Sequence, residues 1–151
     1  MKRVFLDSDI FVRDLRYPRD THAADNQRLI DRLRRKAIPG ATSIFNVLEV
    51  CGILSFNLTE QELLGLYANF PKRYGVKILF PADATGQLQY DIPAIFQQML
   101  KKQSLGDAQI ASAVQRFADH LAAFISWNAR HFADKLAIPA LTPAQYLSRS
   151  D

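Results

Sequence analysis

Three carboxylates stand alone in segments that otherwise carry no charge. Asp7 ends the apolar run at positions 4–6, and Glu49 is the only charged residue between positions 36 and 60. Asp107 is likewise the only charge between positions 102 and 116. An acid among core residues costs several kcal/mol if it is left ionised and unpaired, so each of the three requires a cation, a hydrogen-bond network or a raised pKa.

The three acids define a candidate metal site if the fold brings them together. At a separation of about 4 Å, two carboxylates repel each other by roughly 4 kcal/mol at an effective dielectric constant near 20. A divalent cation is the simplest compensation, and oxygen ligands suit Mg²⁺ and Mn²⁺. Such an ion activates water and offsets charge on a leaving oxygen, which is the chemistry of phosphodiester hydrolysis.

Each acid also has a structural interpretation. Asp107 lies three residues after Ser104, so the pair fits a capping box at a helix start. Asp7 and Asp9 follow an apolar run and are suited to capping the next helix or to forming a turn. Glu49 is harder to explain in this way, because a charged residue in a mostly buried helix with apolar neighbours seldom contributes to stability.

The elements that must position these acids alternate between strands and helices. Apolar runs predict strands at 4–6, 76–80, 121–127 and 138–141, and positions 39–40 mark a turn or a strand entry. Amphipathic patterns and capping residues predict helices at 23–36, from 43 through the run that ends at 54, at 60–72, 93–102 and 104–118, and after 143. This order predicts a single α/β domain over residues 1–151 with a mostly parallel central sheet flanked by helices. In such sheets ligands bind beyond the carboxyl ends of the strands, where Asp7 and Asn128 fall.

Composition indicates a cytoplasmic protein with a polyanionic partner. Nineteen Lys and Arg residues against fifteen Asp and Glu residues give a net charge of +4, which favours such a partner. Cys51 is the only cysteine, so it forms no internal disulfide and fits a reducing compartment. The apolar runs are too short for a secretory signal or a membrane span, so we expect no membrane association.

Four segments of the chain resemble the signature segments of PIN-domain ribonucleases. They are residues 4–9, 41–50, 105–111 and 124–132, and residues 138–147 resemble that family's closing strand and proline-led tail. The resemblance runs nearly end to end and implies a three-layer PIN-like fold. It also implies an RNA-cleaving enzyme whose acids hold one or two Mg²⁺ or Mn²⁺ ions. Many small prokaryotic members of the family are toxins held inactive by an antitoxin protein.

The resemblance assigns roles by position. Asp7, Glu49 and Asp107 would be metal ligands, and Asn128 would take the catalytic place usually held by a fourth acid. Because an amide brings no negative charge, Asn128 implies a weaker second ion. Under the same assignment, Asp9, Ser43, Ser126 and His131 would lie around the metal ligands or contact the substrate.

Two alternative functions remain open at this point. Asp7 and Asp9 also resemble the opening motif of haloacid-dehalogenase-like phosphatases, in which the first Asp attacks phosphate. That family places another acid shortly after Gly-Asp, which residues 108–112 lack, and Glu49 is then unexplained. The missing fourth acid also allows a PIN domain that binds RNA or a protein without cutting.

Two surface features bear on partners. The basic run at 32–36, which includes Arg34 and Arg35, either contacts RNA at the rim of the acidic cleft or stabilises a helix end. The apolar residues in the 62–74 segment suggest a homodimer interface; they are Leu63, Leu64, Leu66, Tyr67 and Phe70.

Overall fold

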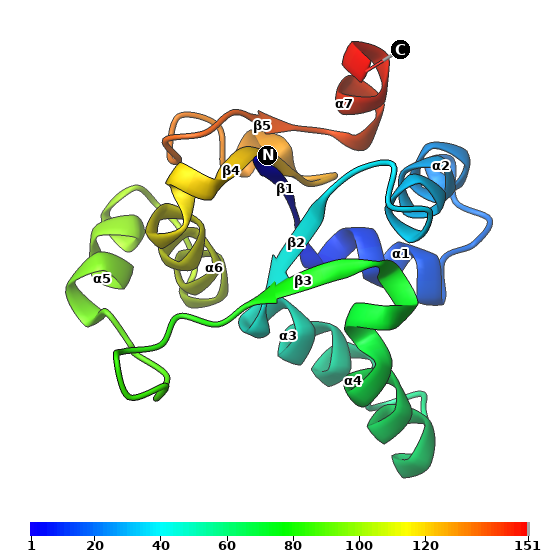
Figure 1. Ribbon diagram of the computed structural model, residues 1–151, viewed down its shortest axis with the longest axis horizontal. Helices are drawn as coiled ribbons and strands as arrows, with labels where there is room; N and C mark the ends of the chain where they lie inside the picture. The colour runs from blue at the N-terminus through cyan, green and yellow to red at the C-terminus, as the bar shows by residue number, and fades with distance from the viewer. Residues whose placement is uncertain (151) are drawn as a thin grey trace.

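The computed structural model describes residues 1–150 and shows an α/β fold built on five parallel strands. The strands are β1 (Arg3–Leu6), β2 (Gly40–Ser43), β3 (Val76–Leu79), β4 (Leu121–Ile125) and β5 (Ala140–Leu141), in the spatial order β3-β2-β1-β4-β5 (Figure 1). β1 therefore lies at the centre of the sheet. The mostly parallel sheet predicted from the sequence is confirmed.

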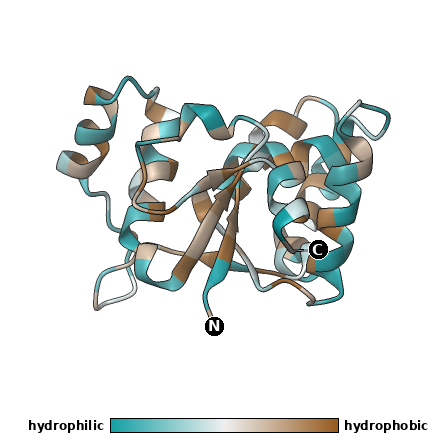
Figure 2. Ribbon diagram, turned by 90° about the horizontal axis from the view of Figure 1, so that it is seen from above, coloured by the Kyte–Doolittle hydropathy of each residue, from teal (hydrophilic) through white to brown (hydrophobic). Residues whose placement is uncertain are grey.

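Helices connect the strands. They are α1 (Ser8–Arg16), α2 (Ala23–Arg34), α3 (Ile44–Leu54), α4 (Glu60–Tyr74), α5 (Ile92–Leu100), α6 (Leu105–Arg116) and α7 (Pro143–Ser150), with short 3₁₀ turns η1 (Ala118–His120) and η2 (Ala129–His131). Figure 2 shows the helices in two groups on either side of the strands. The fold thus has the three layers that the sequence predicted.

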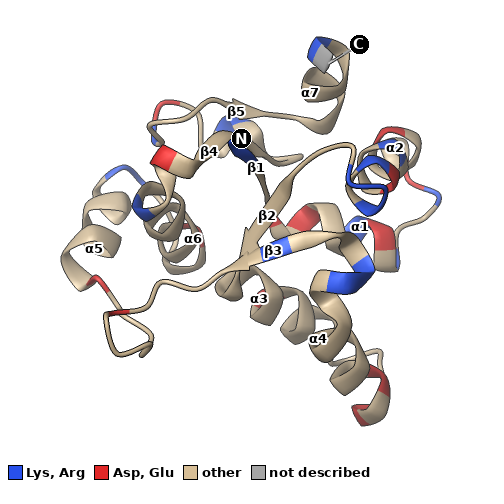
Figure 3. Ribbon diagram, in the orientation of Figure 1, with Lys and Arg blue, Asp and Glu red and all other residues tan. Residues whose placement is uncertain are grey.

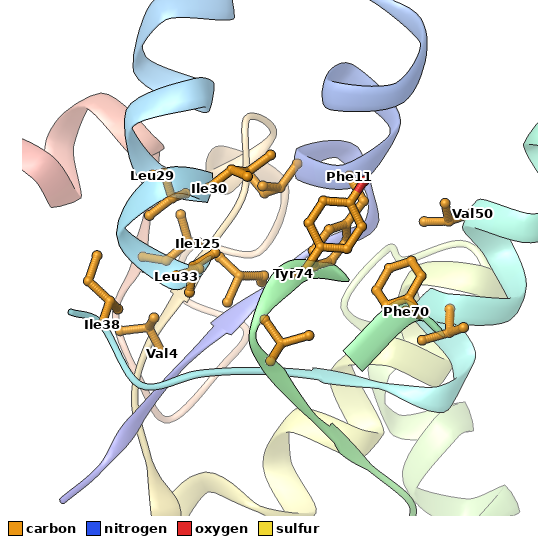
Figure 4. Close-up of a cluster of buried hydrophobic side chains, with 14 of the residues drawn as sticks. Val4, Phe11, Leu29, Ile30, Leu33, Ile38, Val50, Phe70, Tyr74 and Ile125 are labelled. Atoms are coloured by element: carbon orange, nitrogen blue, oxygen red, sulfur yellow. The ribbon is translucent and has the colours of Figure 1, made fainter. Parts of the chain in front are cut away.

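Alternation along the strands produces a separate core on each face of the sheet. Val4 and Leu6 pack into a cluster with α1 to α4 (Figure 4), whereas Phe5 packs into a second cluster with α6. In the second cluster the rings of Phe5 and Phe124 stack with their centroids 5.5 Å apart. Because successive side chains of a strand point to opposite faces, the short β1 anchors both helical layers.

The predicted caps form as hydrogen bonds. The Ser43 hydroxyl accepts from the Asn46 N–H at 3.3 Å, Thr59 accepts from the Glu62 N–H at 3.2 Å, and Ser104 accepts from the Asp107 N–H at 3.3 Å. Each bond satisfies an N–H that a helix start would otherwise leave unpaired. The cap on α6 uses the backbone of Asp107 and leaves its carboxylate available.

Several predicted boundaries were wrong. The sequence left a capped helix or a turn open after the first strand, and the structure shows the helix α1 with Asp7 as its cap. β2 was expected only as a turn or a strand entry. The predicted strand 121–127 ends at Ile125, because Ser126 turns into the site described below. α4 continues past the predicted end at 72 to Tyr74 and stops at Gly75, whose φ of 66° is left-handed. Residue 151 lies outside the described residues.

The predicted dimer segment is largely part of the core. Leu66 and Phe70 are 8% and 0% exposed and pack into the first cluster, whereas Leu64 and Tyr67 face outward. The reason is that α4 is amphipathic, so the apolar residues of the segment do not share one face. In residues 1–150, no helix is both long and apolar enough to cross a membrane.

Candidate active site

The parallel topology brings Asp7 and the segment that follows β4 to the same edge of the sheet. β1 and β4 pair in parallel from Arg3 to Leu6, and Asp7 N–H donates to the carbonyl of Ile125 at 2.9 Å. Asp7 and Ser126 therefore emerge side by side beyond two neighbouring strand ends. This is the edge at which α/β sheets bind ligands, as the sequence predicted.

Asp7 is buried in a network of neutral hydrogen-bond donors. Its Oδ1 accepts from the Ser8 N–H at 2.8 Å and from Asn46 Nδ2 at 3.3 Å, and its Oδ2 accepts from Ser126 Oγ at 2.7 Å. Burial raises the pKa of Asp7 well above its ordinary value, and repulsion from Asp9 raises it further. The hydrogen bonds from Ser126 and Ser8 offset only part of this effect.

Asp9 lies on the other side of Ser126. Its Oδ2 accepts from Ser126 Oγ at 3.0 Å, from the Asn128 N–H at 3.3 Å and from Asn128 Nδ2 at 3.5 Å. Its Oδ1 is buried without a hydrogen-bond partner. Burial raises the pKa of Asp9, although the hydrogen bonds and Arg13 act in the opposite direction. Asn128 therefore serves as a donor to an acid on α1.

The sequence placed Glu49 in a mostly buried helix, but Glu49 is exposed in the structure. α3 turns Val47 and Val50 into the core but presents Leu48 and Glu49 outward, so the apolar sequence around Glu49 is not a fully buried helix. The carboxylate reaches α6, where Glu49 Oε2 is 3.9 Å from the position of a Cβ at Gly106.

The electrostatics of Glu49 link it to the other acids. Desolvation at the carboxylate raises the pKa of Glu49, a hydrogen bond with Ser8 lowers it, and repulsion from Asp107 and Asp9 raises it again. Repulsion from Glu49 also contributes to the raised pKa of Asp7. The four acids thus share one electrostatic environment, although they come from β1, α1, α3 and α6.

These oxygens fit a hard divalent cation. No Lys or Arg in residues 1–150 forms an ion pair with Asp7, Asp9, Glu49 or Asp107, and Arg13 instead pairs with Asp20. Within residues 1–150 the buried Asp9 Oδ1 has no hydrogen-bond partner, and a divalent cation would stabilise the ionised form of such buried carboxylates. Over the same residues, however, no three His, Cys, Asp or Glu side chains are gathered into a compact metal-binding group. The acids approach one another as neighbours and not as a closed cluster.

Asn46 is a site residue that the sequence analysis missed. It is fully buried, and its Nδ2 donates to Ser8 Oγ at 2.9 Å and to Asp7 Oδ1 at 3.3 Å. Its Oδ1 accepts from Ser43 Oγ at 2.5 Å. The available signal was a neutral polar residue in an apolar run, three positions after Ser43 and three before Glu49, which places it on the same helix face.

The outer positions divide into two groups. Ser43 and Ser126 are fully buried, Ser43 orients Asn46, and Ser126 bridges the two aspartates. His131 is exposed, and within residues 1–150 its side chain forms no hydrogen bond with the acids. Arg34 is at the opposite, amino-terminal edge of the sheet, so the predicted basic rim of the cleft was wrong. The helix α2 runs back from the acidic edge and therefore ends far from it.

Comparison with known proteins agrees with this fold. No protein-family model matches the sequence, and no curated protein matches it. Several solved structures match the chain, and three of them cover nearly all of it. FitAB bound to the IR36 DNA fragment is 16% identical and covers 93% of this chain and 94% of its own, with a TM-score of 0.56. VapBC2 from Rickettsia felis, bound to a promoter DNA fragment, is 17% identical and covers 91% of this chain and 96% of its own, with a TM-score of 0.57. FitAcB from Neisseria gonorrhoeae is 14% identical and covers 90% of this chain and 96% of its own, with a TM-score of 0.57.

These matches define the class of the molecule. All three structures are toxin–antitoxin complexes whose toxins are PIN-domain proteins. The chain therefore has the PIN-domain fold, with a group of acids at the carboxyl edge of its sheet. The resemblance seen in the sequence is confirmed at the level of the fold.

Proposed function

We propose that the protein is a divalent-metal-dependent endoribonuclease that acts as the toxin of a toxin–antitoxin pair. The observation that carries the proposal is the approach of four acids to one another at one sheet edge, where no Lys or Arg in residues 1–150 forms an ion pair with them. Burial raises the pKa values of Asp7, Asp9 and Glu49, and repulsion between acids raises those of Asp7 and Glu49 further. A fold shared with toxins from toxin–antitoxin complexes supports the biological role. The net charge of +4 supports RNA as substrate.

In this proposal some residues hold the ion and others orient the residues that hold it. Asp7, Glu49 and Asp107 would hold Mg²⁺ or Mn²⁺, which supplies a Lewis acid and lowers the pKa of a coordinated water. Asn46 and Ser126 fix the two oxygens of Asp7, because each donates to a different one. Hydrogen bonds from neighbouring residues to a metal ligand keep that ligand in the right orientation.

Asp9 supplies negative charge next to the position where the family pattern has a fourth acid. Its carboxylate lies against Asn128, which donates to it from both backbone and side chain. The site therefore contains four acids although position 128 is neutral. We assign Asn128 to orienting Asp9, and this assignment replaces the expectation that Asn128 itself assists the metal.

Cleavage of labelled RNA tests the function. We expect cleavage with Mg²⁺ or Mn²⁺, loss of it in EDTA, and loss of it in Asp7→Asn. Asp134→Asn is the matched control, because Asp134 is exposed and its positive φ of 64° suits asparagine. RNA binding without cleavage at any metal concentration would instead identify a non-catalytic domain. Turnover of a small phosphomonoester in preference to RNA would identify a phosphatase.

The antitoxin is tested separately. We expect a small protein encoded beside this chain to co-purify with it and to abolish RNA cleavage when added back. Growth arrest on expression of the chain alone, relieved by that protein and absent in Asp7→Asn, would support the toxin role. Cleavage of RNA in vitro without any effect on growth would support the nuclease activity and contradict the toxin role.

A further inference from the structure

A basic groove runs along the amino-terminal edge of the sheet. It encloses about 640 Å³ between the end of α2, the last turn of α4 and the start of β3. Among residues 1–150, five cationic residues line it and no acid does; they are Arg3, Arg34, Lys36, Lys72 and Lys77. Figure 3 shows Lys and Arg at the end of α2, in the last turn of α4 and on β3.

We propose that this basic groove binds the phosphate backbone of single-stranded RNA, away from the acids, and so holds a long substrate whose other part enters the cleft. The inference rests on the proposed ribonuclease function and extends it to substrate binding. Phosphate contacts of this kind position a nucleic acid without reading its sequence.

The lysines of the groove are available for such contacts. Lys36, Lys72 and Lys77 are exposed, and within residues 1–150 none of them forms an ion pair. Arg34 is partly compensated, because it lies 3.6 Å from Asp14 and donates to the carbonyl of Arg73 at 3.1 Å. The three lysines therefore carry most of the uncompensated charge.

The backbone fixes the positions from which these lysines extend. Gly75 has a left-handed φ of 66°, and a Cβ added there would lie 2.5 Å from the Leu33 carbonyl oxygen. The end of α2 and the start of β3 thus pack backbone to backbone. Because Lys36 follows α2 while Lys72 and Lys77 flank Gly75, the two charged segments keep one relative position. Because the backbone positions of the lysines are fixed, only their side chains lose entropy on binding.

The groove and the acids lie at opposite ends of the same strand. Arg3 begins β1 and Asp7 follows its end, so about 13 Å of strand separates them at 3.3 Å per residue. A second hollow of about 530 Å³ shares Arg3 and Lys77 with the groove and adds His120. The two hollows therefore adjoin at Arg3 and Lys77, on the edge away from the acids.

Charge complementarity favours RNA as the occupant. A cleft with four acids repels phosphate, so a ribonuclease of this design needs its affinity from contacts made elsewhere. The basic groove is the surface that supplies them, and its walls of Ile38, Pro39 and Pro71 offer neutral contact to sugars and bases. An acidic protein segment is the alternative occupant that the test below can reveal.

The test measures binding of a fluorescent single-stranded RNA of about 30 nucleotides in EDTA, over a series of salt concentrations. The triple variant Lys36→Gln, Lys72→Gln, Lys77→Gln should bind about tenfold more weakly. Its slope of log affinity against log salt should fall by roughly 2, since each contact contributes about 0.7 for single strands. The matched control removes the same charge from Lys101, Lys102 and Lys135 and should bind like the wild type.

Two results would overturn the proposal. The first is that the control variant loses as much RNA affinity as the groove variant, or that the groove variant loses no RNA affinity. The other is a polyglutamate peptide that competes with RNA at equal charge, which would assign the groove to a protein partner. A dinucleotide, too short to span the roughly 13 Å of strand between the acids and the groove, should be cleaved equally by wild type and groove variant. Because binding is measured without metal, its outcome is independent of whether the protein cleaves RNA.

Discussion

The hydroxyl oxygen of Ser126 lies 2.7 Å from Oδ2 of Asp7, in a contact that joins the ends of β4 and β1. The same oxygen is 3.0 Å from Oδ2 of Asp9 and accepts the N–H of Asn128 at 3.0 Å. A hydroxyl has one proton to donate, so at any moment it can donate a hydrogen bond to only one of the two carboxylates. The pair therefore favours either a shared proton or a cation.

The first prediction concerns pH and stability without metal. The pKa values of Asp7, Asp9 and Glu49 are raised in the folded protein, so the folded state binds protons more strongly than the unfolded chain. The resulting stability is present at low pH and is lost as pH rises through the raised pKa values. We expect the melting temperature in EDTA to fall as pH rises above the ordinary carboxyl range of about pH 4.

The Asp7→Asn variant checks the cause of this dependence. An amide keeps the shape of the side chain but cannot ionise, so the variant should show a weaker decline with pH. At pH 8 it should be more stable than the wild type by on the order of 1–2 kcal/mol, or roughly 2–8 °C. Asp134→Asn should decline like the wild type. A flat wild-type profile would contradict the raised pKa values.

The second prediction concerns metal binding. Mg²⁺ or Mn²⁺ should raise the melting temperature by an amount that grows with ion concentration, because the ion binds the folded state. Asp7→Asn, Glu49→Gln and Asp107→Asn should each reduce this effect, and differential scanning fluorimetry measures it. A normal metal response in all three variants would place the ion elsewhere.

The third prediction concerns Asn128 and Asp9. In Asn128→Asp a new carboxylate would lie where Nδ2 is now, 3.5 Å from Oδ2 of Asp9. Without metal this should cost about 1 kcal/mol, a value reduced by the exposure of residue 128. With metal the variant should bind a second ion more tightly in a calorimetric titration. Asn128→Ala, which keeps the backbone donor, serves as the control and should gain no affinity for metal.

The fourth prediction concerns Asn46. Asn46→Ala removes the partner of Ser8, Ser43 and Asp7 in a buried network, so the free energy of unfolding should fall by about 2 kcal/mol. The metal-induced rise in melting temperature should also become smaller, because Asp7 loses a positioning donor. Asn69→Ala is the matched control, because Asn69 is an exposed residue of α4. Equal losses in urea denaturation for both variants would reject a special role for Asn46.

The sequence predicted features that local physics determines. Caps at Ser43, Thr59 and Ser104 and the placement of Asp7 beyond a strand depend on neighbours in the chain, and all four are confirmed. The exposure of Glu49 was not predictable in this way. Hydrophobic neighbours in sequence surround a helical residue on several faces, but only tertiary packing decides which face is covered.

The position of the basic residues was misjudged for a different reason. Sequence shows that Arg34 ends a helix, but not which edge of the sheet that end faces. In a parallel sheet the connecting helices run antiparallel to the strands, so the end of α2 returns to the amino-terminal edge. Asn46 was missed because its polarity in an apolar run was the only local signal, and its contact with Asp7 spans 39 positions.

Gly75 sets a limit on mutational tolerance near the basic groove. In a library that samples every residue at each position, the surface lysines should accept many replacements with the fold intact. Position 75 should accept almost none, since any side chain meets the Leu33 carbonyl and its backbone disfavours L-residues. A scan of folding yield should therefore show an isolated intolerant site among permissive charged positions, and a loss of RNA binding at 72 or 77 would then report lost charge and not lost structure.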